Sequence, residues 1–154
     1  MNIAALVSGG VDSSLALALL KEQGHTPTAF FLKVWSEEDF GLGDCPWEVD
    51  QSFVLKTCHL LGIKAHVLAM QREYWDLVIA YTLEQIKKGC TPNPDVMCNK
   101  LFKFGAFYQR CGHAFDKIAT GHYARIRQSA DGRHHLLVSQ DRRKDQTYFL
   151  SQIS

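Results

Sequence analysis

The sequence lacks the features that mark membrane, secreted and metal-ribbon proteins. It has no run approaching the roughly 18 to 20 apolar residues that a membrane helix needs, and its start, Met1-Asn2-Ile3, lacks the basic segment of a secretory signal. Its five cysteines are odd in number and no two form a C-x-x-C pair, which argues against a disulfide framework and a zinc ribbon. We therefore expect a cytoplasmic protein without a membrane segment and without a metal site.

The composition suits one domain with a substantial core. The chain has 154 residues, of which 46% are hydrophobic and 21% are charged. The net charge of +1 conceals an uneven distribution, because residues 1–84 hold five basic and eleven acidic side chains, whereas residues 85–154 hold twelve and five. Net charges of −6 and +7 favour a polyanionic partner such as nucleic acid for the second half, with a merely solvated basic surface as the alternative.

Apolar runs alternate with amphipathic segments along the chain. Strands are predicted at residues 3–7, 28–34, 64–68 and 117–120, helices at 12–23, 46–61 and about 74–88, loops at 36–44 and 91–94, and a hairpin turn at 129–132. A further helix is expected to bury Leu101, Phe104, Tyr108 and Cys111. Strands alternating with helices predict an α/β domain over residues 1–154 with a doubly wound, mostly parallel sheet.

The first strand ends in a loop whose residues suit an anion, Ser8-Gly9-Gly10-Val11-Asp12-Ser13. Glycines allow close backbone approach, and free amides at a helix start attract phosphate. Ser8 and Ser13 can donate hydroxyls, while Asp12 can hold the loop or reach a magnesium ion. An ordinary turn with an Asp cap is the alternative. The loop is neither a Walker A motif, because Gly-Lys-Ser/Thr is missing, nor a G-x-G-x-x-G motif.

A second motif begins with a double-proline loop, Thr91-Pro92-Asn93-Pro94. The prolines exclude a helix there, which puts Asp95 at the mouth of the next helix and Cys98 on about the same face one turn later. The helix dipole would stabilise a Cys98 thiolate, while Asp95 would oppose it, so the pair suits either nucleophilic or general-base chemistry. The alternative is that Asp95 only caps the helix and Cys98 is a small core residue.

Four motifs, taken in order, resemble those of the bacterial tRNA-specific 2-thiouridylase family, which belongs to the PP-loop ATP pyrophosphatases. They lie at residues 8–13, 91–99, 119–125 and 144–150. The resemblance covers almost the whole chain and implies an adenine nucleotide alpha hydrolase-like fold. It further implies a sulfurtransferase in which ATP, bound with Mg²⁺, adenylates the C2 oxygen of the wobble uridine in tRNAs for Lys, Glu and Gln. Persulfide sulfur then displaces AMP to give 2-thiouridine.

The resemblance also implies roles for individual residues and partners. Cys98 would be one of two catalytic cysteines, with Asp95 as its acid/base partner. The nucleotide would be held by Leu6, Val7, Ser8, Gly9, Gly10, Val11, Asp12, Ser13, Leu32 and Gly121. The tRNA would meet Asn93, Pro94, Asp95, Lys144, Asp145 and Gln146. The partners would be tRNA and a persulfide sulfur-donor protein, either a sulfur relay protein or a cysteine desulfurase.

Two departures from the family bear on these expectations. Cys90 stands where the family usually has Arg, and the chain ends at Ser154. The family's second cysteine, central domain and C-terminal β-barrel lie further on. We therefore expect a catalytic domain alone, which binds ATP but does not turn over thiolated tRNA by itself.

Other classes of protein share part of this pattern. A PP-loop ligase or amidotransferase synthetase domain would share residues 8–13, but it has no use for the Pro-Asn-Pro-Asp-x-x-Cys string, and a non-catalytic nucleotide-binding module is the third option. Metal binding by Cys45, Cys58 and His59 is a weaker interpretation than structural cysteines and a surface histidine. His122 is expected near the nucleotide, because α/β sheets bind ligands at the carboxyl ends of their strands.

Overall fold

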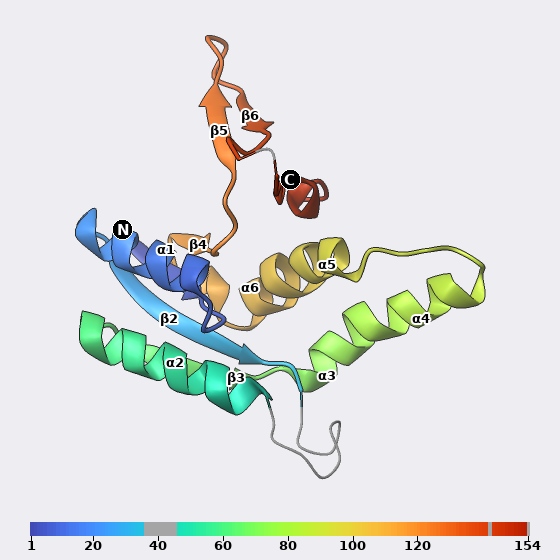
Figure 1. Ribbon diagram of the computed structural model, residues 1–154, viewed down its shortest axis with the longest axis horizontal. Coiled ribbons are helices and arrows are strands. Elements are labelled where there is room, and N and C mark those ends of the chain that lie inside the picture. Colours follow the sequence, from blue (N-terminus) through green and yellow to red (C-terminus); the bar gives the residue numbers. More distant parts are fainter. Residues whose placement is uncertain (36–45, 142, 154) are drawn as a thin grey trace.

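A four-stranded parallel sheet forms the centre of the protein (Figure 1). The computed structural model describes residues 1–35, 46–141 and 143–153. The strand order is β3 (Ala65–Ala69), β2 (Thr26–Lys33), β1 (Asn2–Leu6) and β4 (Lys117–Ala119). Leu6 pairs with Phe30 on one side of β1, and Ala5 pairs with Ala119 on the other. Parallel strands need crossover connections, so helices must cover both faces of this sheet.

The helices occur in two groups along the chain. The crossovers between the first three strands are α1 (Val11–Glu22) and α2 (Pro46–Leu61). The connection from β3 to β4 contains α3 (Gln71–Tyr74), η2 (Trp75–Ile79), α4 (Ala80–Lys87), α5 (Pro94–Met97), η3 (Cys98–Ala106), α6 (Phe107–Arg110) and η4 (Gly112–Ala114). The segments η2 and η3 are π-helical. Within the described residues, no helix is long and apolar enough to cross a membrane.

Each face of the sheet has its own hydrophobic core, because successive side chains of a strand point to opposite faces. Toward α1 and α2 the core contains Ala5, Val7, Leu17, Ala29, Phe31, Val54 and Cys58. Toward the other helices it contains Ala4, Leu6, Phe30, Met70, Val78, Phe102 and Phe107. The predicted doubly wound parallel sheet is thereby confirmed, and each predicted strand lies within two residues of its observed bounds. The loop expected at 36–44 lies outside the described residues.

In the fourth predicted helix, Cys111 packs against the core as expected, but the prediction that Tyr108 is buried is wrong. Tyr108 is 50% exposed, whereas Phe102 and Phe107 are 1% and 0% exposed. These two buried rings are five residues apart, which is the repeat of the π-helical turns in η3 rather than of an α-helix. The wider turn rotates the buried face away from the positions that a 3.6-residue period selects.

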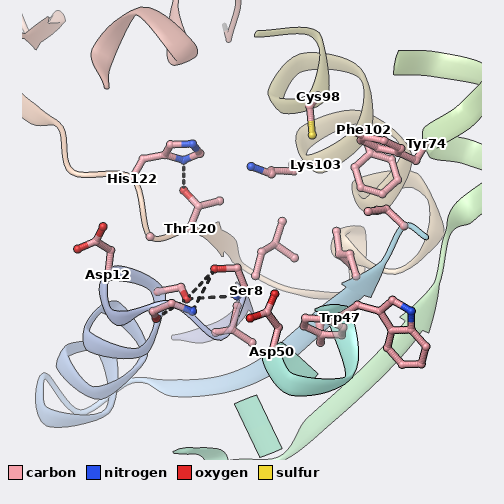
Figure 2. Close-up of a pocket in the computed structure, with 18 of the residues that line it drawn as sticks. Ser8, Asp12, Trp47, Asp50, Tyr74, Cys98, Phe102, Lys103, Thr120 and His122 are labelled. Atoms are coloured by element: carbon pink, nitrogen blue, oxygen red, sulfur yellow. Dashed lines mark hydrogen bonds between the residues drawn. The ribbon is translucent and has the colours of Figure 1, made fainter. Parts of the chain in front are cut away.

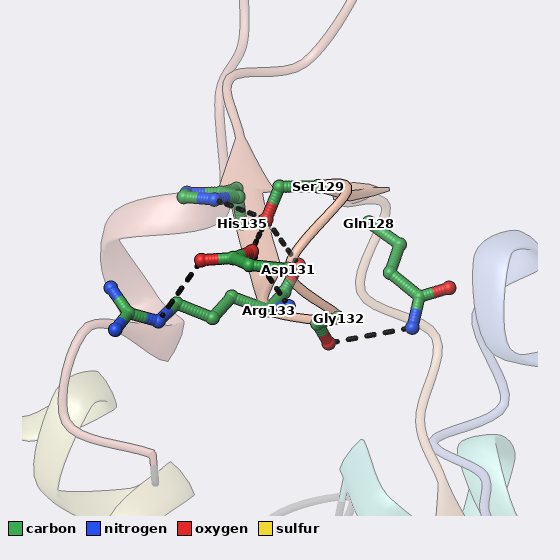
Figure 3. A network of polar contacts seen from close by, with 6 residues as sticks. All are labelled: Gln128, Ser129, Asp131, Gly132, Arg133 and His135. Atoms are coloured by element: carbon green, nitrogen blue, oxygen red, sulfur yellow. Dashed lines mark hydrogen bonds and ion pairs between the residues drawn. The ribbon is translucent and has the colours of Figure 1, made fainter.

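The predicted hairpin is confirmed as an antiparallel pair, β5 (Arg125–Gln128) and β6 (His134–Leu137). Its turn is held by the polar contacts in Figure 3. Asp131 accepts hydrogen bonds from the Ser129 hydroxyl and the Arg133 amide, and it pairs with the Arg133 guanidinium at 3.3 Å. Gly132 has a φ of +83°, a conformation that favours glycine. The chain then returns through the short helix η5 (Thr147–Leu150).

The strand order changes direction at β1, and this creates a crevice. From β1 the chain moves toward β2 and β3, while β4 pairs with the opposite edge of β1. The loops that follow β1 and β4 therefore diverge at the carboxyl edge of the sheet. Such a switch point is the usual ligand site of an open α/β sheet.

Candidate functional site

A cavity of about 480 Å³ lies at this switch point (Figure 2). The volume falls in the range of small-molecule sites. The walls come from the loop after β1, the start of α2, the η3 helix and the loop after β4. The lining residues are Leu6, Val7, Ser8, Gly10, Val11, Asp12, Ser13, Phe31, Leu32, Val34, Trp35, Trp47, Asp50, Tyr74, Cys98, Phe102, Lys103, Thr120, Gly121, His122 and Gln146.

The loop after β1 forms a cradle of hydroxyl and amide groups. The Ser8 amide donates to Ser13 Oγ at 3.2 Å, and the Gly10 amide donates to Ser8 Oγ at 3.4 Å. Gly10 is the N-cap of α1 and no side chain caps it, so amides of the first turn remain for a ligand. The alternative of an Asp cap is therefore excluded, and Asp12, in the first turn of α1, is one of the residues that line the cavity.

At two glycines in this region, a larger side chain would collide with neighbouring backbone atoms. Gly9 has a φ of +86°, and a Cβ there would lie 2.7 Å from the Asp50 carbonyl oxygen. A Cβ at Gly121 would lie 2.7 Å from the Ser13 Cα and amide nitrogen. The loops after β1 and β4 thus touch through backbone atoms, and α2 closes on the first loop from the other side. Gly9 itself lies outside the cavity lining, unlike the other residues expected at 6–13.

Cys98 reaches the same cavity from the opposite wall, while its predicted partner stays at the rim. Asn93 caps α5 by accepting hydrogen bonds from the amides of Asp95 and Val96 at 3.1 and 3.3 Å. The alternative that Asp95 caps this helix is thus excluded. Asp95 is exposed, and Asn93, Pro94 and Asp95 are not among the cavity-lining residues.

Burial of the Cys98 side chain raises the pKa of its thiol, and the nearby Asp95 carboxylate raises it further. Lys103 acts in the opposite direction. The raising effect of Asp95 is as the sequence predicts, whereas Lys103 was not expected, and its lowering effect is outweighed by burial. The thiol is protonated at neutral pH, so its use as a nucleophile requires a base.

His122 follows β4, as the sequence predicts, and lines the cavity. Its Nδ1 lies 2.8 Å from the Thr120 hydroxyl, a hydrogen bond that fixes the ring (Figure 2). Burial and the positive charge of Lys103 lower the pKa of His122, against a smaller opposing effect of Asp95. The imidazole is therefore neutral near pH 7.

Several cavity residues were not expected from the sequence. Lys103 projects into the cavity from η3, and among the described residues five Phe, Trp or Tyr side chains line it: Phe31, Trp35, Trp47, Tyr74 and Phe102. The Tyr74 ring packs edge-on against Phe102 at 5.3 Å and Trp35 at 5.5 Å. Only the π-helical repeat places Lys103 on the face of Cys98, and the sequence carries no sign of that repeat.

Of Lys144, Asp145 and Gln146, the three residues after the hairpin that were expected to meet tRNA, one lines the cavity. Gln146 lines the cavity, whereas Lys144 is exposed outside it. The Asp145 carboxylate accepts hydrogen bonds from the Ser139 amide and from the amide and hydroxyl of Thr147, which lower the pKa of that carboxyl. Asp145 therefore shapes the turn in which Gln146 and Lys144 lie.

The donor set fits a nucleotide. The hydroxyls and free amides of residues 8–13 suit phosphates, and the apolar and aromatic wall suits a base. Among the described residues, no group of three His, Cys, Asp or Glu side chains could hold a metal ion alone. A thiol, a neutral imidazole and an ammonium face the same space, so a reaction at the phosphate end of the nucleotide could proceed beside Cys98.

The fold and the cavity define a nucleotide-binding α/β domain of the HUP class, a class that implies use of ATP. The family model of the tRNA methyl transferase HUP domain matches residues 1–154, and the chain belongs to this family. This agrees with the adenine nucleotide alpha hydrolase-like fold that the PP-loop motif implied.

Curated relatives carry a more specific name. The chain is 48% identical over 154 residues to tRNA-specific 2-thiouridylase MnmA of Parabacteroides distasonis, and 51% identical over 154 residues to MnmA 1 of Bacteroides thetaiotaomicron. The matches cover 100% and 99% of this chain but only 43% and 42% of those proteins. The chain therefore spans less than half the length of these relatives.

A solved structure supports the fold. A predicted subunit of tRNA methyltransferase from Methanocaldococcus jannaschii matches with a TM-score of 0.51 and 21% identity, over 79% of this chain and 53% of that one. At this identity the match bears on the fold alone.

Proposed function

We propose that residues 1–154 are the ATP-binding catalytic domain of a tRNA 2-thiouridylase. The observation that carries this proposal is the convergence of the loop at residues 8–13 and Cys98 on one cavity. A PP-loop ligase or synthetase domain would need only the loop. Relatives named tRNA-specific 2-thiouridylase at 46% to 51% identity add to the proposal. The reaction would take place in the cytoplasm, on tRNA.

In the activation step, residues of the loop hold ATP while the uridine C2 oxygen attacks the α-phosphate. The new O–P bond replaces the bond between the α- and β-phosphates, and pyrophosphate leaves with that electron pair. The amides of the first turn of α1 and the hydroxyls of Ser8 and Ser13 would bind the phosphates. Leu6, Val7, Leu32 and Gly121 supply the surrounding wall or a close backbone approach.

Magnesium would enter with the nucleotide. Mg²⁺ prefers oxygen ligands and is commonly held by one or two carboxylates together with substrate phosphates. Among the residues that the structure describes, the carboxylates that line the cavity are Asp12 on α1 and Asp50 on α2. We assign the metal contact to Asp12, as the loop motif suggests.

In the sulfur step, the outer sulfur of a persulfide attacks C2, and AMP leaves with the electron pair of the C2–O bond. Cys98 would then attack the inner sulfur, which releases 2-thiouridine and leaves a disulfide. Since burial keeps this thiol protonated, it needs a proton acceptor. Asp95, whose charge acts on Cys98 from one helical turn away, would take the proton. A persulfide donor protein and a thiol reductant are the co-reactants.

Thiolation of wobble uridine tests the proposal directly. The domain would be assayed within a full-length 2-thiouridylase, which would be incubated with Mg-ATP, tRNA for Lys, Glu or Gln and a persulfide donor, and 2-thiouridine would be measured by mass spectrometry. Cys98→Ser should abolish the product and leave ATP affinity unchanged. Cys90→Ser is the matched control, because Cys90 is an exposed thiol outside the cavity. Full activity of Cys98→Ser would contradict the assignment of this thiol.

Binding of ATP is a separate test of the loop. Asp12→Ala and Ser13→Ala should each weaken Mg-ATP binding by about tenfold or more, because each removes a contact to a charged group. Isothermal titration calorimetry measures the affinity, and Lys64→Ala, outside the cavity, is the control. Unchanged affinity in both loop variants would rule out the loop as the nucleotide site.

A further inference from the structure

Lys103 occupies a position in the cavity that the motifs do not explain. It lies on η3, five residues after Cys98, and the π-helical repeat puts the two side chains on the same face. Figure 2 shows its ammonium group pointing into the space between Cys98 and His122, across from the loop that contains Ser8. It therefore lies between the candidate phosphate cradle and the candidate thiol.

This ammonium group has no counter-ion among the residues that the structure describes. The ion pairs of those residues involve other cations, and no hydrogen bond joins Lys103 to a neighbour. The side chain is partly buried, unlike the exposed Lys100 on the same helix, whose Nζ donates to Gln152 at 3.3 Å. A partly buried cation that faces a cavity without a partner is costly unless a ligand supplies the negative charge.

The electrostatic influence of Lys103 reaches both neighbours. Its positive charge lowers the pKa of the Cys98 thiol and of the His122 imidazole. The position of the Lys103 ammonium in Figure 2 and its effect on both pKa values therefore agree: the ammonium faces Cys98 and His122. An anion bound beside Lys103 would lie within reach of the reacting thiol.

We propose that Lys103 binds the α-phosphate of the nucleotide and stabilises the charge that develops on it during activation and release of AMP. The inference rests on the proposed nucleotide site. The α-phosphate is the one assigned because it must lie between the loop at residues 8–13 and Cys98, since sulfur transfer displaces it. The ammonium donates hydrogen bonds to non-bridging oxygens and neither gains nor loses a proton in the reaction.

AMP affinity is the decisive measurement, because AMP carries the α-phosphate alone. Lys103→Met keeps the length of the side chain and removes its charge, so the Kd for AMP should rise at least about tenfold. Lys103→Arg should retain an affinity within about threefold of the wild type, because it restores a charged donor. Lys100→Met, on the exposed side of the same helix, should bind AMP as the wild type does.

The pH profile of Cys98 alkylation provides a readout that a purely structural role would not move. It would be followed by mass spectrometry of peptides cleaved before Asp95, so that Cys98 and the exposed Cys90 fall on different peptides. The profile should shift to higher pH in Lys103→Met and stay in place in Lys103→Arg. This measurement does not depend on nucleotide.

The outcomes separate this inference from the proposed function. If the wild type binds AMP and Lys103→Met binds it equally well, the inference is overturned and the proposed function stands. If Lys103→Met unfolds, loss of AMP binding in the folded Lys103→Arg variant would overturn it instead. A wild-type protein that binds neither ATP nor AMP would overturn both.

Discussion

Gly9 lies where the backbone of the loop at residues 8–13 meets α2, and a substitution at Gly9 tests that contact. Gly9→Ala must adopt a positive φ, at about 1–2 kcal/mol, and its Cβ would overlap the Asp50 carbonyl, which adds about 1–3 kcal/mol. Gly89→Ala is the matched control, because Gly89 has a φ of +78° and open space around it. Urea unfolding should show a larger loss of stability for Gly9→Ala. Equal losses would contradict the contact.

His122 makes stability depend on pH in a definite direction. Its pKa is lowered in the folded protein, so between the folded and the unfolded pKa the unfolded chain binds more protons. Stability contributed by this group is complete above the unfolded value of about 6.5 and falls as the pH drops toward the folded value. His122→Gln should flatten the pH dependence of the unfolding free energy below pH 6.5. A profile that is identical in both proteins would exclude His122 as its source.

The sequence alone could place those cavity residues whose position depends only on the conformation of their neighbours in the chain. Ser8, Gly10 and Ser13 follow a strand directly, so their place at a helix start can be inferred from neighbours in the chain. Lys103 and Trp47 reach the cavity from elements remote from that loop. Their place depends on the helix register and on the packing of α2, which no short motif encodes.

At the scale of elements, the π-helical register of η3 predicts that truncating Phe102 destabilises the protein more than truncating Tyr108. Phe102→Ala removes a ring that is 1% exposed and should cost about 3–5 kcal/mol. Tyr108→Ala, which truncates the 50% exposed ring predicted to be buried, should cost about 0.5 kcal/mol or less. Chemical denaturation of the two variants checks this. A greater cost for Tyr108→Ala would favour the α-helical register.

The elements differ in how far a sequence can define them. The strands and α1 are recovered nearly residue by residue, because buried parallel strands are short apolar runs and Gly24 and Gly62 follow the ends of α1 and α2. The η3 segment is also predicted as helical. Its widened turns are not, because π-helical turns are stabilised by tertiary packing, here of Phe102 and Phe107 in the core between the sheet and its covering helices.

For the whole molecule, topology joins the two motifs that lie far apart in sequence. A doubly wound sheet brings the carboxyl ends of β1 and β4 to one edge, which is how residues 8–13 and His122 come to share a cavity. This follows from the alternation of strands and helices. The approach of Cys98 does not, because it depends on how the long β3–β4 connection folds back over the sheet.

The division of charge between the two halves of the chain also belongs to the whole molecule. The basic half contains Lys144, which is exposed beside the turn that brings Gln146 to the cavity. The adjacent Arg143 pairs with Asp141 at 3.2 Å, so Lys144 has the less compensated charge of the two. If this region meets tRNA, Lys144 should neutralise a phosphate.

Lys144→Ala should then weaken tRNA binding and reduce the slope of log K against log salt concentration by about 0.7–0.9, the effect of one phosphate contact. Filter binding of tRNA at a series of salt concentrations measures both quantities. Lys117→Ala is the matched control. Lys117 is exposed and belongs to the same basic half, but it lies at the amino end of β4, at the edge of the sheet opposite the cavity. Equal slopes for the Lys144→Ala variant and the wild type would mean that the excess of +7 serves solvation and not RNA binding.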